Sequence, residues 1–511
     1  PGHPSQIGAG DQGLIFLDDF EGTRTSIDLR FPLVAWALAS TPQGNPKFPE
    51  ASLTDSIDYN FNRAKLAWYN IEPNLQDRNS PNNPLRRNLT ELSDPRVRQV
   101  FTNEIFPQRT TNITDVQTST FDLAYYPTER GPYNFESRQT EIDANGKLAR
   151  PASRWGGLMR SIDQTDFETG NIEYIEFWVQ DPFIRNPAGT GGKLYLNLGN
   201  TSEDILKDGR RFYENGMNTP AIPAAVDSTN TWGKTPVNPI QITQAFSNNP
   251  DDRPYQDVGF DGLDDAAERR KKGYVLDKLA ANFGTGSSLY QKVLADPSND
   301  NYKWYRDPVF DESGTGILGR YKNFNNPQGN SPIATTGGQF TSAATLYPDN
   351  EDLNRDNTLN ESEAYYEYEI QLKPGMDVGV TPYITDKRKI SVNSPDGIRR
   401  TEDWFLFRVP VRSYSKKVGS IPDFKSIRFA RMYLTDFEDS VVLRLARLDL
   451  VRNQWRQFAY NIDTTGSYTP INNTGGTVLN TLAVSLEENS SRQPVNYIMP
   501  PGVERVQLLS N

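Results

Sequence analysis

The chain contains no cysteine, and its 511 residues include one histidine, His3. The lack of cysteine excludes disulfides, thiolate zinc sites and cysteine nucleophiles. A single histidine near the start argues against a histidine-based catalytic triad and a histidine-ligated transition metal. No run approaches the roughly 18 apolar residues of a membrane-spanning helix, and no segment has the layout of a signal peptide. Because the chain begins with Pro1, we expect a piece of a longer protein that carries any export signal or anchor elsewhere.

Acidic side chains outnumber basic ones, with 65 Asp and Glu against 54 Lys and Arg and a formal net charge of -11. This balance argues against nucleic acid and anionic lipid as partners, because both repel an acidic surface. It favours sites for hard cations, which bind carboxylate oxygens.

The remaining composition predicts a mainly β protein. The chain holds 25 Phe, 24 Tyr and 8 Trp, enough to fill several cores, together with 36 Pro and 37 Gly. Its mean hydropathy of -0.68 indicates long polar loops between short strands rather than a helical bundle. At this length we expect two to four domains.

Two stretches of the chain have the same pattern. Apolar runs at 172–179 and 193–198 are joined by a linker rich in Pro, Asn and Gly, which predicts adjacent strands of one sheet. A second pair follows at 427–434 and 441–450. In the run SIRFARMYL neither face is purely polar, so we expect both faces of that strand to be at least partly covered.

These patterns predict a mainly β fold with long loops and a few short helices. We expect two jelly-roll-like (galactose-binding-like) β sandwiches with a mixed insertion between them. The expected divisions are a first β domain over 13–206, a loop-rich insertion with short helices over 207–345, a second β domain over 346–460 and a tail over 461–511. Within the insertion, apolar spacing predicts helices over 264–283 and 287–294.

The clearest chemical motif is DLNRDNTLNESE at 352–363. Oxygen ligands stand at positions 1, 3, 5, 7, 9 and 12 of this loop, as in the calcium loop of an EF-hand. Asn357 replaces the usual Gly at position 6, and asparagine tolerates the left-handed backbone required there. A polar surface loop is the alternative interpretation. The predicted calcium ligands are Asp352, Asn354, Asp356, Thr358 through its main-chain carbonyl, Asn360 and Glu363.

A second, weaker match is DVGFDGLDDAAE at 257–268. Gly262 stands at position 6, while Gly259 at position 3 supplies no side-chain ligand. The alternative is an acidic start to the following helix, which the helix dipole favours. The predicted ligands here are Asp257, Asp261, Leu263 through its carbonyl, Asp265 and Glu268.

Other candidate residues carry weaker signals. The carboxylates Asp18, Asp19 and Glu21 could in principle hydrolyse glycosides, but the sequence does not show a pair at the required separation. The basic run 269–272 is most simply a solvated helix face. Five aromatic side chains could stack on sugars, although burial in the core or anchoring of loops explains them better: Tyr125, Tyr126, Trp232, Trp304 and Tyr305.

Several long stretches resemble the SprA (Sov) family of gliding-motility proteins. The resemblance runs from about residue 13 to 505. It is carried by FLDDFEGTRTSIDLR, WALASTP, NRAKLAWYN, RGPYNF, WGGLMR with TDFETGNIEYIEFWVQDPF, PDNEDLNRDNTLNESEAYYEYEI and EENSSRQPVNYIMPPGVER.

The resemblance implies a non-enzymatic part of the outer-membrane translocon of the type IX secretion system of Bacteroidetes. Implied partners are the remainder of the same β-barrel translocon, a PorV-like partner barrel, a plug protein and secreted cargo proteins. The chain departs from the family pattern because it lacks a series of alternating segments of about ten residues that would span a bilayer. We therefore expect an extramembrane insertion that caps the pore on the extracellular side. The competing hypothesis is a secreted, calcium-stabilised carbohydrate-binding module.

Overall fold

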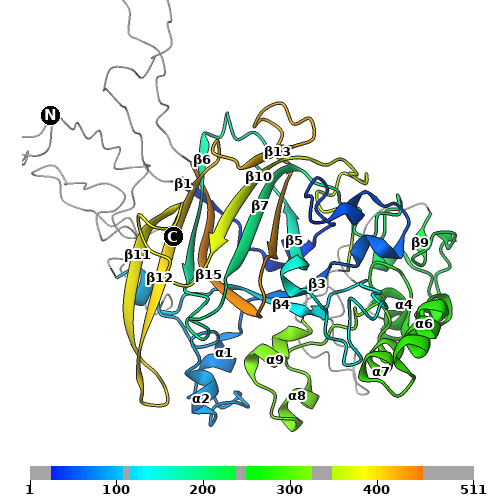
Figure 1. Cartoon of the computed structure of the whole chain (residues 1–511), viewed down its shortest axis with the longest axis horizontal. Helices are drawn as coiled ribbons and strands as arrows, with labels where there is room; N and C mark the ends of the chain where they lie inside the picture. The colour runs from blue at the N-terminus through cyan, green and yellow to red at the C-terminus, as the bar shows by residue number, and fades with distance from the viewer. Residues whose placement is uncertain (1–24, 108–115, 238–245, 247–248, 325–347, 453–511) are drawn as a thin grey trace, which may run out of the picture.

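The computed structural model describes residues 25–107, 116–237, 246, 249–324 and 348–452. Two antiparallel β sheets that pack face to face dominate this part of the chain (Figure 1). The first sheet has the strand order β11-β12-β6-β15-β4-β3, with β1 paired to β15. Its strands are β1 (Thr25–Asp28), β3 (Ala64–Tyr69), β4 (Phe121–Arg130), β6 (Ile172–Gln180), β11 (Ile384–Asn393), β12 (Arg399–Pro410) and β15 (Val441–Arg452).

The second sheet has the order β13-β10-β7-β14-β5-β2. Its strands are β2 (Ala37–Leu38), β5 (Trp155–Ser161), β7 (Gly192–Asn200), β10 (Ala364–Leu372), β13 (Lys416–Val418) and β14 (Phe429–Thr435). A separate short ribbon joins β8 (Val226–Asp227) to β9 (Thr235–Pro236). The expectation of a mainly β fold with a few short helices is confirmed.

The predicted strand pairs are arranged differently from the expectation. β6 and β7 lie in opposite sheets, and so do β14 and β15. β6 instead pairs with β15, and β7 pairs with β14. The reason is that these strands are largely buried on both faces, so the sequence pattern defines the strands but not their partners. Strands from the two expected sandwiches therefore form one sandwich, which corrects the expectation of two.

The helices are short and lie outside the sandwich. The α helices are α1 (Pro73–Gln76), α2 (Leu89–Leu92), α3 (Thr102–Ile105), α4 (Arg253–Gln256), α5 (Asp265–Lys271), α6 (Gly273–Phe283), α7 (Ser288–Ala295), α8 (Pro308–Glu312) and α9 (Ile317–Lys322). The 3-10 helices are η2 (Leu33–Ala35), η3 (Pro49–Ser52), η4 (Ile57–Asn60), η5 (Pro151–Ser153), η6 (Glu214–Gly216) and η7 (Pro250–Asp252).

The helix expected over 264–283 is divided at Lys272 into α5 and α6. The Asp264 side chain begins α5 by accepting a hydrogen bond from the Ala267 amide at 2.7 Å, which satisfies one free amide of the first turn. α7 begins in the same way, because the Ser287 hydroxyl accepts from the Tyr290 amide. Helices α4, α6 and α7 gather at one end of the molecule (green in Figure 1).

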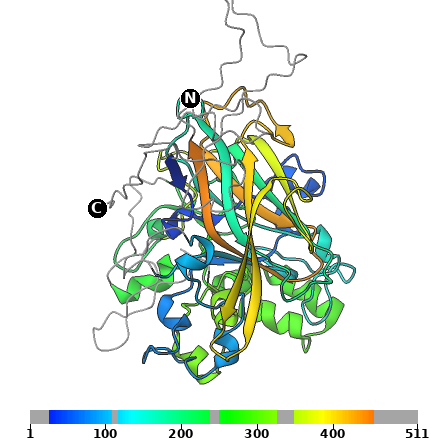
Figure 2. The ribbon, with the colours of Figure 1, turned by 90° about the vertical axis from the view of Figure 1, so that its left-hand side faces the viewer.

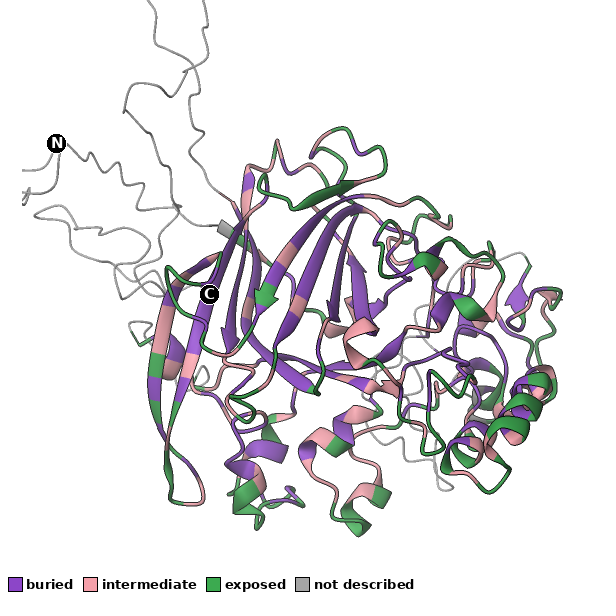
Figure 3. Ribbon diagram, in the orientation of Figure 1, coloured by how far each residue is buried: buried purple, intermediate pink, exposed green. Residues whose placement is uncertain are grey.

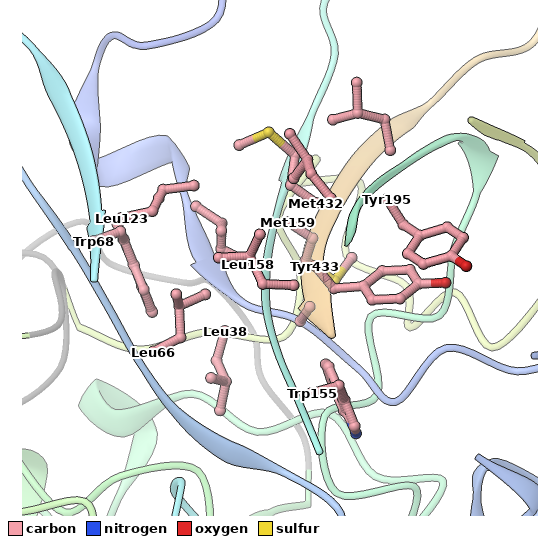
Figure 4. Close-up of a cluster of buried hydrophobic side chains, with 14 of the residues drawn as sticks. Leu38, Leu66, Trp68, Leu123, Trp155, Leu158, Met159, Tyr195, Met432 and Tyr433 are labelled. Carbon is pink, nitrogen blue, oxygen red and sulfur yellow. The ribbon is translucent and has the colours of Figure 1, made fainter. Parts of the chain in front are cut away.

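The main core lies between the two sheets. Phe405, Phe407 and Val409 of β12 belong to it, and Phe407 stacks on Phe177 of β6 with ring centroids 4.8 Å apart. Figure 4 shows part of this apolar packing, including Leu66. Burying one such side chain contributes about 1.5–3 kcal/mol to stability.

The outer face of the first sheet is covered as well. Trp404 and Leu406, which alternate with the inward residues of β12, pack against a separate apolar cluster that includes Ile105 of α3. The buried ion pair between Arg98 and Glu402, at 2.6 Å, ties the covering loop to β12. Figure 3 shows the resulting buried character along the strands. In the second sheet every residue of β14 is buried, which agrees with the expectation of a strand covered on both sides.

The hairpin of β11 and β12 extends beyond the neighbouring strands (yellow in Figure 2). Beside the main strand order of the first sheet, β1 lies antiparallel to the interior strand β15, with Thr25 opposite Arg452. The expected tail over 461–511 falls outside the described residues.

Candidate cation-binding loops

The loop 352–363 forms the turn that its sequence predicts. The Asp352 carboxylate is 1% exposed, and it accepts hydrogen bonds from the amides of Asp356 at 3.0 Å and Asn357 at 2.9 Å. Asn357 has a φ of 66°, so the left-handed backbone expected at position 6 is present. The first half of the loop is thus folded as a calcium-loop turn would be.

The middle oxygens of this loop also accept from loop donors. Asn354 Oδ1 accepts from the Asp356 amide at 3.1 Å, and Asp356 Oδ1 accepts from the Thr358 amide at 2.8 Å. The Asn360 side chain donates to the Thr201 carbonyl at 2.7 Å. Asp356 and Thr358 are exposed. The structure therefore brings Asp352, Asn354 and Asp356 into one turn.

The structure does not bring Glu363 to that turn. Both of its carboxylate oxygens accept from the Arg431 guanidinium at 2.9 Å. Glu203 lies against the loop instead, accepting from the amides of Leu353 at 2.7 Å and Asn360 at 3.2 Å. Burial, together with the charge of Asp352, raises the pKa of Glu203 to about 7. Glu203 follows β7, far from the motif in sequence, so the spacing of the loop could not reveal it.

In the second loop, 257–268, two predicted carboxylates meet inside the protein. Asp261 and Glu268 are each 1% exposed. Ser298 links them, since its hydroxyl donates to Asp261 Oδ2 at 2.7 Å and its amide donates to Glu268 Oε2 at 3.2 Å. Gly262 has a φ of 66°, as position 6 of such a loop requires. The Leu263 amide donates to Asp261 Oδ1 at 3.0 Å.

The first residue of this loop is turned elsewhere. The charge of Asp257 acts on Glu214 and raises its pKa, after burial as the main cause. Glu214 is fully buried and accepts hydrogen bonds from the Val258 and Gly259 amides at 3.1 and 2.9 Å. Of the predicted ligands, Asp261 and Asp265 each lie close to Glu268, whereas Asp257 is not part of this group.

Two carboxylates that the sequence analysis missed complete the group. Ligand oxygens of Asp261, Glu268 and Asp300 all lie within 4.8 Å of one another, and so do those of Asp265, Glu268 and Asp296. Asp296 and Asp300 belong to the stretch DPSND at 296–300. The alternation of oxygen-bearing side chains at 296, 298 and 300 was the available signal. We refer to Asp261, Glu268 and Asp300 as the buried acidic triad.

Burial and mutual repulsion dominate the electrostatics of this group. Burial raises the pKa of Asp261 to about 6 and, with repulsion from Asp261, that of Glu268 to about 10. The pKa of Asp300 is raised well above its usual value by burial and then by Glu268 and Asp261. The nearby Lys272 ammonium partly offsets the negative charge, although burial lowers the pKa of Lys272 to about 8.

Lys272 differs from the solvated residue expected in the basic run 269–272. It is fully buried, and its ammonium lies 5.1 Å from the ring centroids of both Phe135 and Trp232. It also donates to the Thr231 carbonyl at 2.8 Å. Arg270 of the same run is exposed, as expected.

The candidate sugar-stacking aromatics are mostly packed inside the protein. Tyr125 and Trp232 are 0% exposed. Tyr305 stacks on Tyr321 with ring centroids 4.6 Å apart. Tyr126 and Trp304 are partly buried. The candidate glycosidase carboxylates Asp18, Asp19 and Glu21 lie outside the described residues.

Within the described ranges, none of the helices is both long and apolar enough to cross a membrane. No curated protein matches the chain. The fold is a β sandwich with long irregular loops, and buried carboxylates accept hydrogen bonds from the main-chain amides of those loops.

Residues 274–511 match the model of the family SprA_N, described as a motility related/secretion protein. That segment is therefore similar to the SprA family of secretion and motility proteins. The match includes β10 to β15 and therefore supplies strands to both sheets.

Proposed function

We propose that the chain is a non-enzymatic, extramembrane part of the type IX secretion translocon, on the cell-surface side of the outer membrane. There it supports protein export and gliding motility as a cap over the pore exit. The observation that carries this proposal is the family match over residues 274–511, because the family description names secretion and motility.

The proposal extends to the residues before the match because of strand pairing. β12 and β15 of the matched segment pair with β6, and β10 and β14 pair with β7. The two halves thus share both sheets. A unit of this kind acts as one rigid frame, since neither half completes a sheet without the other.

The pairing of β1 with β15 supports an insertion within a larger protein. Thr25 and Arg452 are directly opposite each other in this pair. A sandwich whose first and last strands lie side by side can be inserted in a host with little disturbance. The proposed partners are the remainder of the translocon barrel, a PorV-like partner barrel, a plug protein and cargo proteins.

The β11–β12 hairpin offers a surface for such partners. It projects from the sheet edge (Figure 2), and its tip exposes Ile398, which is 56% accessible. Lys389 and Arg399 on the same hairpin are exposed in a chain whose net charge is -11. A basic hairpin on an acidic protein suits an acidic partner surface. Carbohydrate binding is less well supported, because the candidate stacking aromatics are packed against other side chains.

The test removes residues 25–452 in frame from the parent gene in its own bacterium. We expect loss of cargo from the culture medium and loss of colony spreading. The amount of the parent protein in the outer membrane must be unchanged, as a blot measures. Normal secretion and spreading with the segment removed would contradict the proposal, and so would selective glycan binding by the purified chain.

The same bacterium reports the side of the membrane. Because the chain has no cysteine, Lys389→Cys introduces a single reactive thiol within it. We expect a membrane-impermeant maleimide to label this exposed thiol in intact cells. Ala67→Cys is the matched control, since Ala67 is 0% exposed and its thiol should stay unlabelled. Labelling of Lys389→Cys that requires permeabilised cells would place the unit on the inner side.

A further inference from the structure

We propose that the buried acidic triad, Asp261, Glu268 and Asp300, forms a site for a hard divalent cation of the calcium class. The inference concerns the purified chain and does not depend on its place in a secretion machine. The triad joins two loops that are separate in sequence, 257–268 and 296–300, so a bound ion would hold them together.

The donor set suits such an ion. The triad offers carboxylate oxygens, all within 4.8 Å of one another, and the Ser298 hydroxyl lies beside it, 2.7 Å from Asp261 Oδ2. Calcium takes six to eight oxygen ligands and tolerates irregular geometry. The site has neither thiolate nor imidazole, because the chain lacks cysteine and its single histidine is His3. Softer transition metals prefer those ligands.

One oxygen of the triad points to a missing ligand. Asp300 Oδ2 is buried beside the Tyr133 hydroxyl, but it makes no hydrogen bond of normal geometry among the described residues. Leaving a buried carboxylate oxygen unpaired is unfavourable by about 1–3 kcal/mol or more. A cation that binds this oxygen would remove that cost.

Gly259 explains how Asp300 enters the loop. In the 12-residue loop spacing, Gly259 stands at position 3, where a side-chain ligand is usual. A Cβ at Gly259 would lie 2.2 Å from Asp300 Oδ2. Asp300 therefore occupies the space of the absent side chain and brings the oxygen that position 3 lacks. Asp300 thus links the stretch 296–300 to the loop 257–268.

The surrounding charge also favours a cation. The groups that face the triad are two further carboxylates, Asp265 and Asp296, and the cations Lys272 and Arg130. Five carboxylates thus stand against two cations. Lys272 and Arg130 are occupied with main-chain carbonyls, of Thr231 at 2.8 Å and Pro297 at 3.1 Å.

A different arrangement would satisfy the same oxygens without metal. If protons are shared between the carboxyl groups, each pair behaves as a carboxylic acid bonded to a carboxylate. The two explanations make opposite predictions. If a cation binds, removing the charge of Asp300 lowers the affinity for that cation. If the carboxyl groups share protons instead, the same change reduces their mutual repulsion and raises the stability of the folded chain.

The experiment titrates calcium into the 511-residue chain after treatment with a chelator, by calorimetry and by thermal unfolding. We expect saturable binding and a rise in melting temperature. Asp300→Asn should weaken binding by at least about tenfold, because it replaces a charged ligand by a neutral one. Magnesium should bind more weakly, since it requires a compact octahedral site.

Two control variants locate the ion. Asp277→Asn alters an exposed carboxylate of α6 and should bind calcium as the unchanged chain does. Asp356→Asn alters the loop 352–363, and loss of the calcium effect in that variant alone would overturn the proposal. Absence of calcium binding to the unchanged chain, or equal binding to Asp300→Asn, would also overturn it. If Asp300→Asn does not unfold cooperatively, Glu268→Gln provides the same comparison.

Discussion

At the scale of single residues, Asp122 of β4 shows how the core holds a carboxylate. Its side chain is 0% exposed, and its nearest cation is the buried Arg444 at 3.5 Å. Arg444 also donates to the carbonyls of Pro95 at 2.7 Å and Arg98 at 3.0 Å. The pKa of Asp122 is raised to about 6, because burial raises it more than the charge of Arg444 lowers it. The loss of hydration therefore outweighs the attraction of the pair.

This shift predicts a specific pH dependence. A carboxyl whose folded pKa is raised contributes stability that is full below its unfolded pKa and is lost as pH rises through the folded value. We expect the stability of the unchanged chain relative to Asp122→Asn to fall by about 3 kcal/mol as pH rises from about 4 to above 6. Urea unfolding at several pH values measures this difference. Parallel stability curves for the unchanged chain and Asp122→Asn would contradict this prediction. The control variant Asp277→Asn should give a curve parallel to that of the unchanged chain.

At the scale of elements, β12 joins the main core to the outer cluster. Its residues alternate, with Phe405 and Phe407 on the inner face and Trp404 and Leu406 on the outer face. The strand pairs with β11 on one side and β6 on the other. A side chain lost from either face therefore leaves a cavity that the flanking strands cannot close.

We expect Phe407→Ala to destabilise the chain by about 3–5 kcal/mol, because it deletes a fully buried ring. Its stacking partner Phe177, 4.8 Å away, adds about 0.5–1.5 kcal/mol of coupling. A double-mutant cycle with Phe177→Ala, followed by urea unfolding, measures both quantities. Val380→Ala is the control, since Val380 is 66% exposed and should change stability by less than about 0.5 kcal/mol. Additive effects of the two phenylalanine variants would contradict the coupling.

Several strands and one loop residue lie where the sequence predicts them. The apolar run expected at 441–450 is β15, and the alternation in SIRFARMYL is β14. Asn357 adopts the left-handed backbone that its loop position requires. Strand partners could not be predicted, because β6, β7, β14 and β15 are largely buried on both faces. Glu203 could not be predicted either, since it reaches its loop from a distant part of the chain. For Asp300 the signal was the alternation of oxygen-bearing side chains at 296, 298 and 300.

At the scale of the whole molecule, the two halves are interdigitated. β6 lies between β12 and β15, and β7 lies between β10 and β14. The four central pairings thus each join a strand before residue 274 to a strand inside the family match.

This arrangement predicts that residues 274–511 do not fold alone. Without β6 and β7, the matched strands lose their central neighbours and expose unpaired edges, which favour aggregation. Production of 1–273 and 274–511 as separate chains in one cell should restore a soluble complex. Circular dichroism and size-exclusion chromatography compare the fragment, the complex and the unbroken chain. Cooperative unfolding of 274–511 by itself would contradict the prediction.

The antiparallel β1–β15 pair also determines how the unit responds to force. Since Thr25 faces Arg452, the start of β1 and the end of β15 lie side by side at one end of this strand pair. Tension applied between these two residues would break the hydrogen bonds of the pair one after another instead of shearing them together. Under such a load β1 would therefore detach first, while the central strands stay paired.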